Sequence, residues 1–359
     1  MNAMRHGRER GMSLVELMVG ILVGLLVVMA ASGSLAFFEG QRRTSLAGDA
    51  AMNSGVMAGY VMQRDVRNGG VGLMNATQLA CTGLNLYYNA VTRADGTAVA
   101  PVQITDGGAG SDAVTVFFTD SVLGSAPVQL THGFTAAGDN LRVNSTSGLQ
   151  VGDVVLIASS VPTDPCTVAQ ISSITPVASE IELGRAAGAG RPWNAPNPAA
   201  AFATAPLYPA GGMVVKAGNT VTWRRYDVTN GALNATDLVT GNSIKVAANV
   251  LSLQAQYGVT DGISNEIRRW VDATAEWASP TADLVMRIRA VRFSVVVRSD
   301  RKELVTDGAG NCAVTTAAPS PWPDVPALDL SADPEWRCYR YQVYASIAPL
   351  KNVVWGVAQ

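Results

Sequence analysis

The sequence contains only two histidines in its 359 residues, His6 and His132. A Ser-His-Asp triad would depend on His132, whose Thr-His-Gly setting is turn-like, so an exposed loop histidine is the simpler interpretation. A histidine-rich metal site is excluded by the same count. No Walker-type phosphate loop occurs, and Gly188-Ala189-Gly190 is not followed by a helix start. These absences argue against an enzyme and predict no cofactor and no metal.

Charge is also scarce, at 15% of residues, and the formal net charge is -2. Residues 1–11 carry three arginines and one glutamate, which leaves the rest of the chain near -4. No basic stripe follows, so nucleic acid is not expected as a partner. Two acidic, glycine-bearing loops, 261–266 and 307–311, lack EF-hand spacing. We interpret both as solvated turns, with an oxygen-only calcium site as the alternative.

An uncharged apolar run extends from Leu17 to Phe38. Its 22 residues would form a helix of roughly 33 Å, enough to cross the hydrocarbon core of a bilayer. Arg5, Arg8 and Arg10 precede it, and such a basic flank stays cytoplasmic. The sequence therefore predicts a single-pass membrane protein with its N-terminus inside and its C-terminal head outside.

The stretch before this run reads Arg10-Gly11-Met12-Ser13-Leu14-Val15-Glu16-Leu17. A carboxylate at the edge of a membrane helix costs free energy unless it finds a partner. The stretch resembles the cleavage and assembly signal of type IV prepilins. The resemblance implies cleavage between Gly11 and Met12, methylation of the Met12 amine, and pairing of Glu16, the fifth mature residue, with the amine of a neighbouring subunit.

The match departs from the family at Met12, where phenylalanine is usual. A plain single-pass anchor would explain the apolar run, but it gives Glu16 no role. A secretory signal cleaved near Ser34-Leu35-Ala36 is a second alternative, although an acidic residue at the start of its apolar core argues against it.

Further stretches resemble the PilW type of minor pilin. Asp65-Val66-Arg67 followed by Gly69 to Gly72 stands where that family closes its first helix. The C-terminal half follows the family order, with Gln254 to Gly258, Trp270, Val291 to Ser299, Tyr339 to Tyr341 and Leu350-Lys351-Asn352. The resemblance implies a long helix packed on an antiparallel sheet.

We therefore predict an α+β, type IV pilin-like fold. The expected parts are a leader at 1–11, a helix at 12–68 with its transmembrane part at about 17–38, and a β-rich head at 69–359. The core-facing stripe of the helix is predicted to contain Leu46, Ala50, Met57, Tyr60 and Val61.

In the head, alternating and apolar runs bounded by turn residues predict short strands. An inserted β module is expected at about 130–183, followed by an irregular segment at 185–209. A hairpin is predicted from 213–216 and 220–226, turning at Gly218-Asn219. Further strands are expected at 113–119, 141–143, 153–158, 167–174, 180–183, 244–258, 285–298 and 337–348.

The four cysteines, Cys81, Cys166, Cys312 and Cys338, form no CxxC pair, so zinc and thioredoxin-like sites are disfavoured. An exported head allows disulfides, with three connectivities. We expect Cys312–Cys338 and Cys81–Cys166, with free buried thiols as the alternative.

The predicted function is assembly of a type IV pilus as a minor pilin, in a priming or tip complex. Expected partners are the prepilin peptidase, other minor pilins and the major pilin, the inner-membrane assembly platform and membrane lipid. A minor pseudopilin of a type II secretion system is the closest alternative, and a membrane-anchored periplasmic binding protein or enzyme is the alternative of another class.

Overall fold

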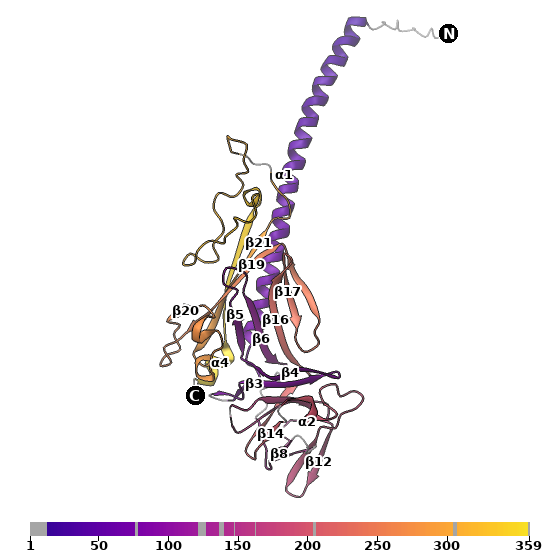
Figure 1. The fold of residues 1–359 in the computed structure, drawn as a ribbon. Coiled ribbons are helices and arrows are strands. Elements are labelled where there is room, and N and C mark those ends of the chain that lie inside the picture. The colour runs from indigo at the N-terminus through magenta and orange to yellow at the C-terminus, as the bar shows by residue number, and fades with distance from the viewer. Residues whose placement is uncertain are drawn as a thin grey trace, which may run out of the picture.

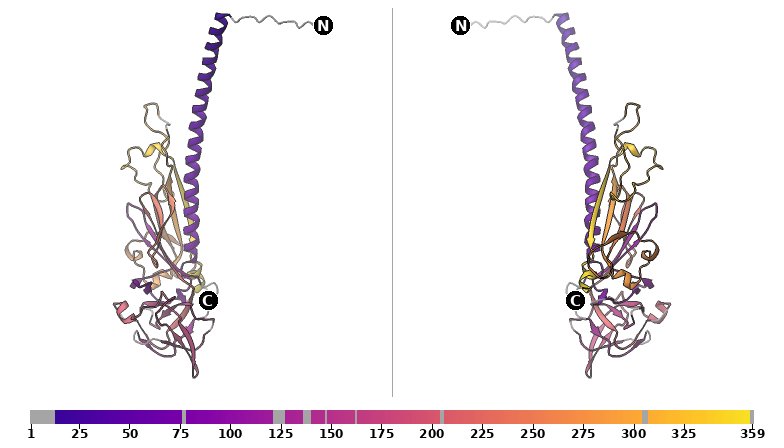
Figure 2. Two further views of the ribbon diagram at one scale, coloured as in Figure 1. Left: turned by 90° about the vertical axis from the view of Figure 1, so that its right-hand side faces the viewer. Right: turned by 90° about the vertical axis from the view of Figure 1, so that its left-hand side faces the viewer.

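The chain forms one long helix and a β-rich head packed against the helix's C-terminal part (Figure 1). The computed structural model describes residues 13–75, 78–120, 127–135, 140–146, 148–161, 163–203, 206–303 and 307–357. Helix α1 spans Leu14–Asn68 without interruption. Its N-terminal part projects away from the head in every view (Figure 2). The predicted α+β fold with a long N-terminal helix is confirmed.

Helix α1 buries a stripe formed by Gly55, Ala58, Met62, Asp65 and Val66. These residues recur at intervals of three and four and so share one side of the helix. Gly55 belongs to the stripe because a Cβ there would lie 1.9 Å from the ring of Tyr344.

The predicted stripe was wrong over these turns. Met57 and Tyr60 are exposed, whereas Val61 is partly buried at the edge of the core. The side chains of Leu46 and Ala50 lie outside the described part of the structure. The error arose because a glycine and an aspartate, which a hydrophobic pattern does not count, define the packed side of the helix.

The sheet against α1 is antiparallel, in the order β20 (Arg269–Val271), β19 (Val250–Val259), β21 (Ile288–Arg298) and β22 (Tyr341–Pro349). Strands β21 and β22 contact the helix directly. The inner face of β21 contributes the buried core residues Val291, Phe293, Val295 and Val297.

A second antiparallel sheet completes this core. Its order is β18 (Ser243–Ala248), β17 (Ala232–Asp237), β16 (Val221–Thr229), β6 (Ala113–Thr119) and β5 (Val102–Thr105). Residues of both sheets and of α1 belong to one hydrophobic cluster, so the C-terminal part of the helix folds together with the sheets.

A third group of strands forms a lobe at the end of the head farthest from the N-terminus of α1 (Figures 1 and 2). Its main sheet has the order β4 (Val91–Ala98), β3 (Gly83–Tyr88), β11 (Cys166–Gln170), β10 (Val154–Ala158), β15 (Met213–Gly218) and β7 (Val128–Gln129). The strands expected between residues 130 and 183 lie in this lobe, together with strands from outside that range.

Small elements complete the described structure. They are β1 (Met74–Asn75) with β2 (Gln78–Leu79), β8 (Phe134–Thr135) with β14 (Leu207–Tyr208), and β9 (Asn140–Val143) with β13 (Glu180–Gly184) and β12 (Ser173–Val177). The short helices are α2 (Pro198–Ala201), η1 (Ala275–Trp277), α3 (Ala282–Val285), η2 (Trp336–Cys338) and α4 (Lys351–Val357).

The hairpin predicted at 213–226 was wrong. Strand β15 pairs with β10 and β7, whereas β16 pairs with β17 and β6. The chain leaves one sheet and enters the other across Asn219 and Thr220, whose N–H groups donate to the carboxylate of Asp120. A local turn pattern cannot distinguish a hairpin from this crossing, because non-local strand pairing decides it.

Other boundaries also shifted. The strand predicted at 167–174 is divided between β11 and β12, and the one at 244–258 breaks at Asn249, where φ is +57°. The last strand begins at Tyr341 because 336–338 forms a 3-10 helix. Its inner face carries Tyr344 and Ala348, which belong to the core region around α1, so the alternating residues Tyr341, Val343 and Ala345 lie on the opposite face of the strand.

A long connection, residues 299–340, returns from β21 to β22 and extends toward the N-terminal half of α1 (Figure 1). Arg292 on the outer face of β21 fixes it. The Arg292 guanidinium lies 4.5 Å from the Trp322 ring centroid and 5.1 Å from that of Trp270. It donates to the Asp324 carboxylate at 2.7 and 3.3 Å and to Gln256 Oε1 at 2.7 Å.

We predict that Arg292→Ala releases this connection and lowers the free energy of unfolding by roughly 2–3 kcal/mol, through loss of two cation-π contacts and several charged hydrogen bonds. Hydrogen exchange should rise most across 319–328. Arg301→Ala, at an exposed position in the same connection, is the matched control and should change neither quantity. Equal exchange in both variants would contradict the assignment.

Asp112 joins the turn between β5 and β6 to β19. Its two carboxylate oxygens accept the N–H groups of Gly107 at 2.9 Å and Ala255 at 2.7 Å. Burial raises the pKa of this carboxyl from 3.8 to about 6, although both hydrogen bonds oppose the shift.

The folded state therefore holds a proton on Asp112 between about pH 4 and 6 that the unfolded state has released, so stability must fall as pH rises through this range. We expect a decrease of about 1–2 kcal/mol, after allowance for solvent screening. Urea unfolding of the full chain in detergent between pH 4 and 7 measures it. The Asp112→Asn variant should lose this part of the pH dependence, and an unchanged pH profile would refute the argument.

Candidate assembly site

The N-terminal part of α1 is an exposed apolar surface. Leu14–Leu35 is the one helical segment in the described residues that is long and apolar enough to cross a membrane. None of it is buried against the rest of the chain. The helix starts at Leu14, and the Leu17 N–H donates to the Ser13 carbonyl at 3.1 Å.

Glu16 lies in the first turn of this segment and is exposed. Among the described residues no cation pairs with it. A carboxylate in the first turn interacts favourably with the positive end of the helix dipole, but that contribution is at most about 1 kcal/mol. Its position therefore leaves it open to a partner from another chain. Gly11 and Met12, the predicted cleavage and methylation residues, lie outside the described residues.

At the other end of the helix, a buried ion pair joins α1 to the head. The side chain of Asp65 has no exposed surface. Its Oδ2 accepts hydrogen bonds from Arg224 Nη1 at 2.5 Å and Tyr226 Oη at 2.7 Å, both on β16. Arg64 Nη2 lies 3.2 Å from Oδ1 but is largely exposed.

The pKa values around Asp65 follow from this geometry. Burial lowers the pKa of the Arg224 guanidinium, but its hydrogen bond with Tyr226 and the charge of Asp65 raise it more, so the group remains a cation. Burial and the same carboxylate raise the pKa of the Tyr226 hydroxyl, which remains protonated. Arg224 and Tyr226 therefore compensate the negative charge of Asp65, which would be costly in free energy to bury in the core without a partner.

The C-terminal end of α1 is also tied to the last helix. Asn352 Nδ2 donates to the carbonyls of Asn68 and Gly69 at 3.3 and 3.1 Å. The last carbonyls of a helix lack partners within it, so this side chain caps the end. The helix stops here, as predicted from the glycines, because Gly69 leaves the helical conformation with ψ of 132° and Gly70 follows with φ of +88°.

Asp65 and Asn352 both belong to the stretches that resemble the PilW type, but nothing in those stretches connects them to Arg224, Tyr226 or the helix end. The spacing of Asp65 could have indicated its burial, because it lies three residues after Met62 on the side of the helix that also carries Ala58. No signal in the sequence identified Arg224 as its partner, because 159 residues separate them.

The cysteines are joined as Cys81–Cys166 and Cys312–Cys338, the pairing expected from the sequence. The first links the segment after α1 to β11 within the core of the lobe. The second fastens the 299–340 connection close to the start of β22. The first disulfide thus joins residues 85 positions apart, whereas the second closes a loop of 26 residues within the connection.

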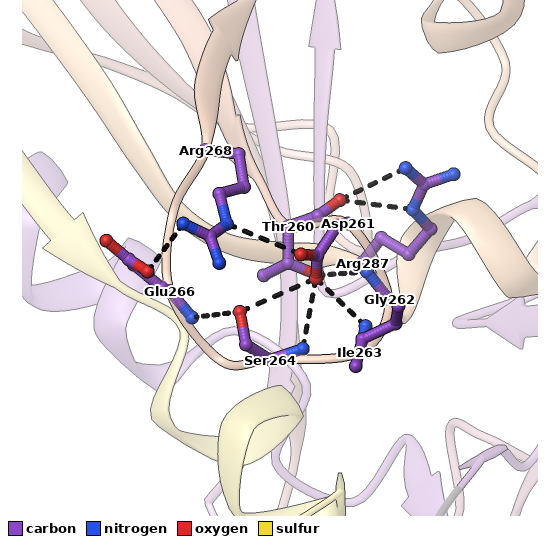
Figure 3. A network of polar contacts seen from close by, with 8 residues as sticks. All are labelled: Thr260, Asp261, Gly262, Ile263, Ser264, Glu266, Arg268 and Arg287. Atoms are coloured by element: carbon purple, nitrogen blue, oxygen red, sulfur yellow. Dashed lines mark hydrogen bonds and ion pairs between the residues drawn. The ribbon is translucent and has the colours of Figure 1, made fainter.

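The remaining candidate residues are peripheral. His132 is exposed and lies 3.3 Å from Glu180. The acidic loop at Asp261 is a turn in which Oδ1 accepts the N–H groups of Ile263 and Ser264 at 2.9 and 3.0 Å (Figure 3). These bonds lower the Asp261 pKa to about 2.

The same loop is fastened from outside by two arginines. Arg268 Nε lies 3.3 Å from Asp261 Oδ2, and Arg287 donates twice to the Thr260 carbonyl (Figure 3). In the loop at Asp307 the carboxylate similarly accepts N–H groups of Asn311 and Ala309, both at 2.9 Å. Both loops are therefore held by local hydrogen bonds of the chain itself.

Comparison with known families identifies two regions. The Prokaryotic N-terminal methylation motif matches residues 6–32, and the Type IV Pilus-assembly protein W family, PilW, matches residues 214–352. This chain carries a PilW domain behind a prepilin motif. The resemblance to PilW-type minor pilins is thus confirmed over these two regions, and the two matches support a role as a type IV pilin. PilW is a pilus-assembly family and not an enzyme class.

Among solved structures, a type IV-like pilin from Thermus thermophilus matches at 10% sequence identity and a TM-score of 0.30, covering 87% of this chain and 97% of the other. No curated protein sequence matches the chain.

The region matched by PilW contains most of the head residues described above at the contact between the head and α1, although β5 and β6, which precede residue 214, also belong to the cluster around the helix. Arg224, Tyr226, Phe293, Tyr344 and Asn352 all lie between residues 214 and 352. The lobe lies mostly outside this region, which contributes only β15 to its main sheet. The region matched by PilW therefore supplies the buried ion pair, the β21 and β22 contacts and the Asn352 cap that fix the helix, and β5 and β6 complete the core around it.

We predict that Asp65→Ala lowers the free energy of unfolding by about 3–4 kcal/mol, since it leaves Arg224 unpaired in a partly buried position. Arg64→Ala removes the exposed partner of the same carboxylate and should cost at most about 1 kcal/mol. Urea unfolding of both variants in detergent tests this difference. Equal decreases in the free energy of unfolding would show that the buried ion pair does not fix α1 to the head.

Proposed function

We propose that this chain is a minor pilin that is cleaved between Gly11 and Met12, methylated at Met12 and assembled into a type IV pilus. The observation that carries the proposal is Glu16, a carboxylate with no cationic partner among the described residues, at the start of an exposed apolar helix and inside a methylation motif that matches residues 6–32. Because the motif places Glu16 at the fifth mature position, its carboxylate would pair with the methylated amine of a neighbouring subunit.

Before assembly, the helix would cross the inner membrane once. The arginines of the leader would keep the N-terminus cytoplasmic and place the head in the periplasm. Two disulfides support that placement, because such bonds persist in an oxidising compartment. The prepilin peptidase and the inner-membrane assembly platform are the partners this route requires.

In the fibre, the apolar segment would pack among the helices of other minor pilins and of the major pilin. The head carries a lobe that lies mostly outside the PilW region. A large head favours a position in a priming or tip complex, because a subunit at the end of the fibre has fewer neighbouring subunits to accommodate. The PilW match supports this role over that of a type II secretion pseudopilin.

Replacement of Glu16 by alanine should leave membrane insertion and leader cleavage intact while reducing the number of pili at least tenfold, because the carboxylate that fixes register is lost. Electron microscopy counts the fibres, and immunoblotting of membranes confirms insertion and cleavage. Ser13→Ala is a matched control in the same turn. Normal piliation of the Glu16→Ala cells would rule out the assigned role.

The cleavage position is tested separately by mass spectrometry of the N-terminal peptide of the mature protein. We expect a chain that begins with N-methylated Met12, and Gly11→Leu should block cleavage. A mature N-terminus at another residue would overturn the prepilin assignment.

A further inference from the structure

The outward side of α1 carries a second feature near the helix end. Val56, Met57 and Tyr60 are exposed, each by more than half of its surface. They lie on the side opposite the buried stripe of Ala58 and Met62. A shallow hollow of about 300 Å³ begins at Tyr60 and continues toward the end of the helix.

This hollow is lined by Tyr60, Gln63, Arg64, Arg67, Asn68 and Lys351. It therefore contains three cationic side chains and no carboxylate among its lining residues. Arg67 and Lys351 are exposed, and neither forms an ion pair within the described part of the chain. Arg64 shares Asp65, whose other oxygen is occupied by Arg224 and Tyr226.

The walls of the hollow are held in place. Gln63 Nε2 donates to Ser346 Oγ at 2.9 Å, which ties the helix to β22. Asn352 bonds the Asn68 and Gly69 carbonyls and so fixes the start of α4, which carries Lys351. The positive charge is consequently presented on a fixed frame, which lowers the entropy cost of binding.

We propose that this hollow and the adjoining Val56, Met57 and Tyr60 form a docking surface for an acidic segment of a neighbouring protein. One or two carboxylates of the partner occupy the hollow, and apolar side chains beside them cover Tyr60 and Met57. The apolar contact supplies most of the binding free energy, while the three cations orient the partner and exclude basic segments.

The position of the surface favours a protein over a lipid headgroup. Leu35 ends the segment that can cross a membrane, and Arg64 follows it by 29 residues on one continuous helix. At ~1.5 Å per residue this places the hollow about 44 Å from the end of that segment. Headgroups of the membrane that carries the helix cannot reach so far. The openness of the hollow toward solvent also distinguishes it from the enclosed pockets that hold small molecules.

The inference extends the proposed assembly role, since it names the surface and the chemistry by which a neighbouring subunit is held. It does not depend on Glu16, which lies at the opposite end of α1.

The test uses the full-length chain in cells, with a benzoylphenylalanine photocrosslinker in place of Tyr60. After irradiation, the linked peptide is identified by mass spectrometry. We expect a peptide with Asp or Glu within a few residues of the linked position. Adducts to phospholipid alone, a protein peptide without nearby acidic residues, or no adduct would each overturn the proposal.

Charge reversal then tests the role of the cations. Arg67→Glu combined with Lys351→Glu should lower the crosslink yield at least tenfold, and changing the identified partner carboxylate to lysine should restore it. Lys245→Glu with Arg301→Glu makes the same change in net charge at exposed positions elsewhere and should leave the yield unchanged. Equal yields in both double variants would overturn the proposal. The neutral pair Arg67→Gln with Lys351→Gln, which perturbs folding less, should give an intermediate yield.

Crosslinking is measured on total cell protein, so docking is visible whether or not fibres form. Failure of the proposed function would appear as normal piliation of Glu16→Ala cells, whereas failure of this inference would appear as a crosslink yield unaffected by charge reversal.

Discussion

The buried ion pair of Asp65 with Arg224 is the interaction on which the arrangement of helix and head depends. A single continuous helix can connect a membrane to a folded head only if its far end is fixed to that head. Asp65 fixes it at one side, where a carboxylate without exposed surface meets both a guanidinium and the Tyr226 hydroxyl. Because an unpaired buried charge is costly, helix positions that separate these groups are strongly disfavoured.

Three further contacts between α1 and the head act together with this ion pair. Gly55 lets the Tyr344 ring approach the helix backbone, Gln63 bonds Ser346, and Asn352 caps the last carbonyls. These contacts fix the rotation of α1 about its axis. The rotation decides which helix residues face outward, so the exposed Tyr60 and Arg67 are a consequence of the same joint.

The two ends of α1 therefore serve different purposes. The N-terminal end has no contacts with the head and leaves its apolar surface and Glu16 available to other helices. The C-terminal end is built into the core of the PilW domain. Between them, the 299–340 connection reaches back along the helix, and Arg292 and the Cys312–Cys338 disulfide hold it in place.

The sequence by itself determined the features that depend on local chemistry. The apolar run, the motif around Glu16, the glycine stop of the helix and most of the short strands could be predicted because each requires only neighbouring residues. Tertiary structure alone decided which helix face is buried, that β15 and β16 enter different sheets, and that Asp65 pairs with Arg224. These depend on strand pairing and packing between residues far apart in the sequence. Burial there makes a charged residue or a glycine part of the packed surface, which no hydrophobic pattern reveals.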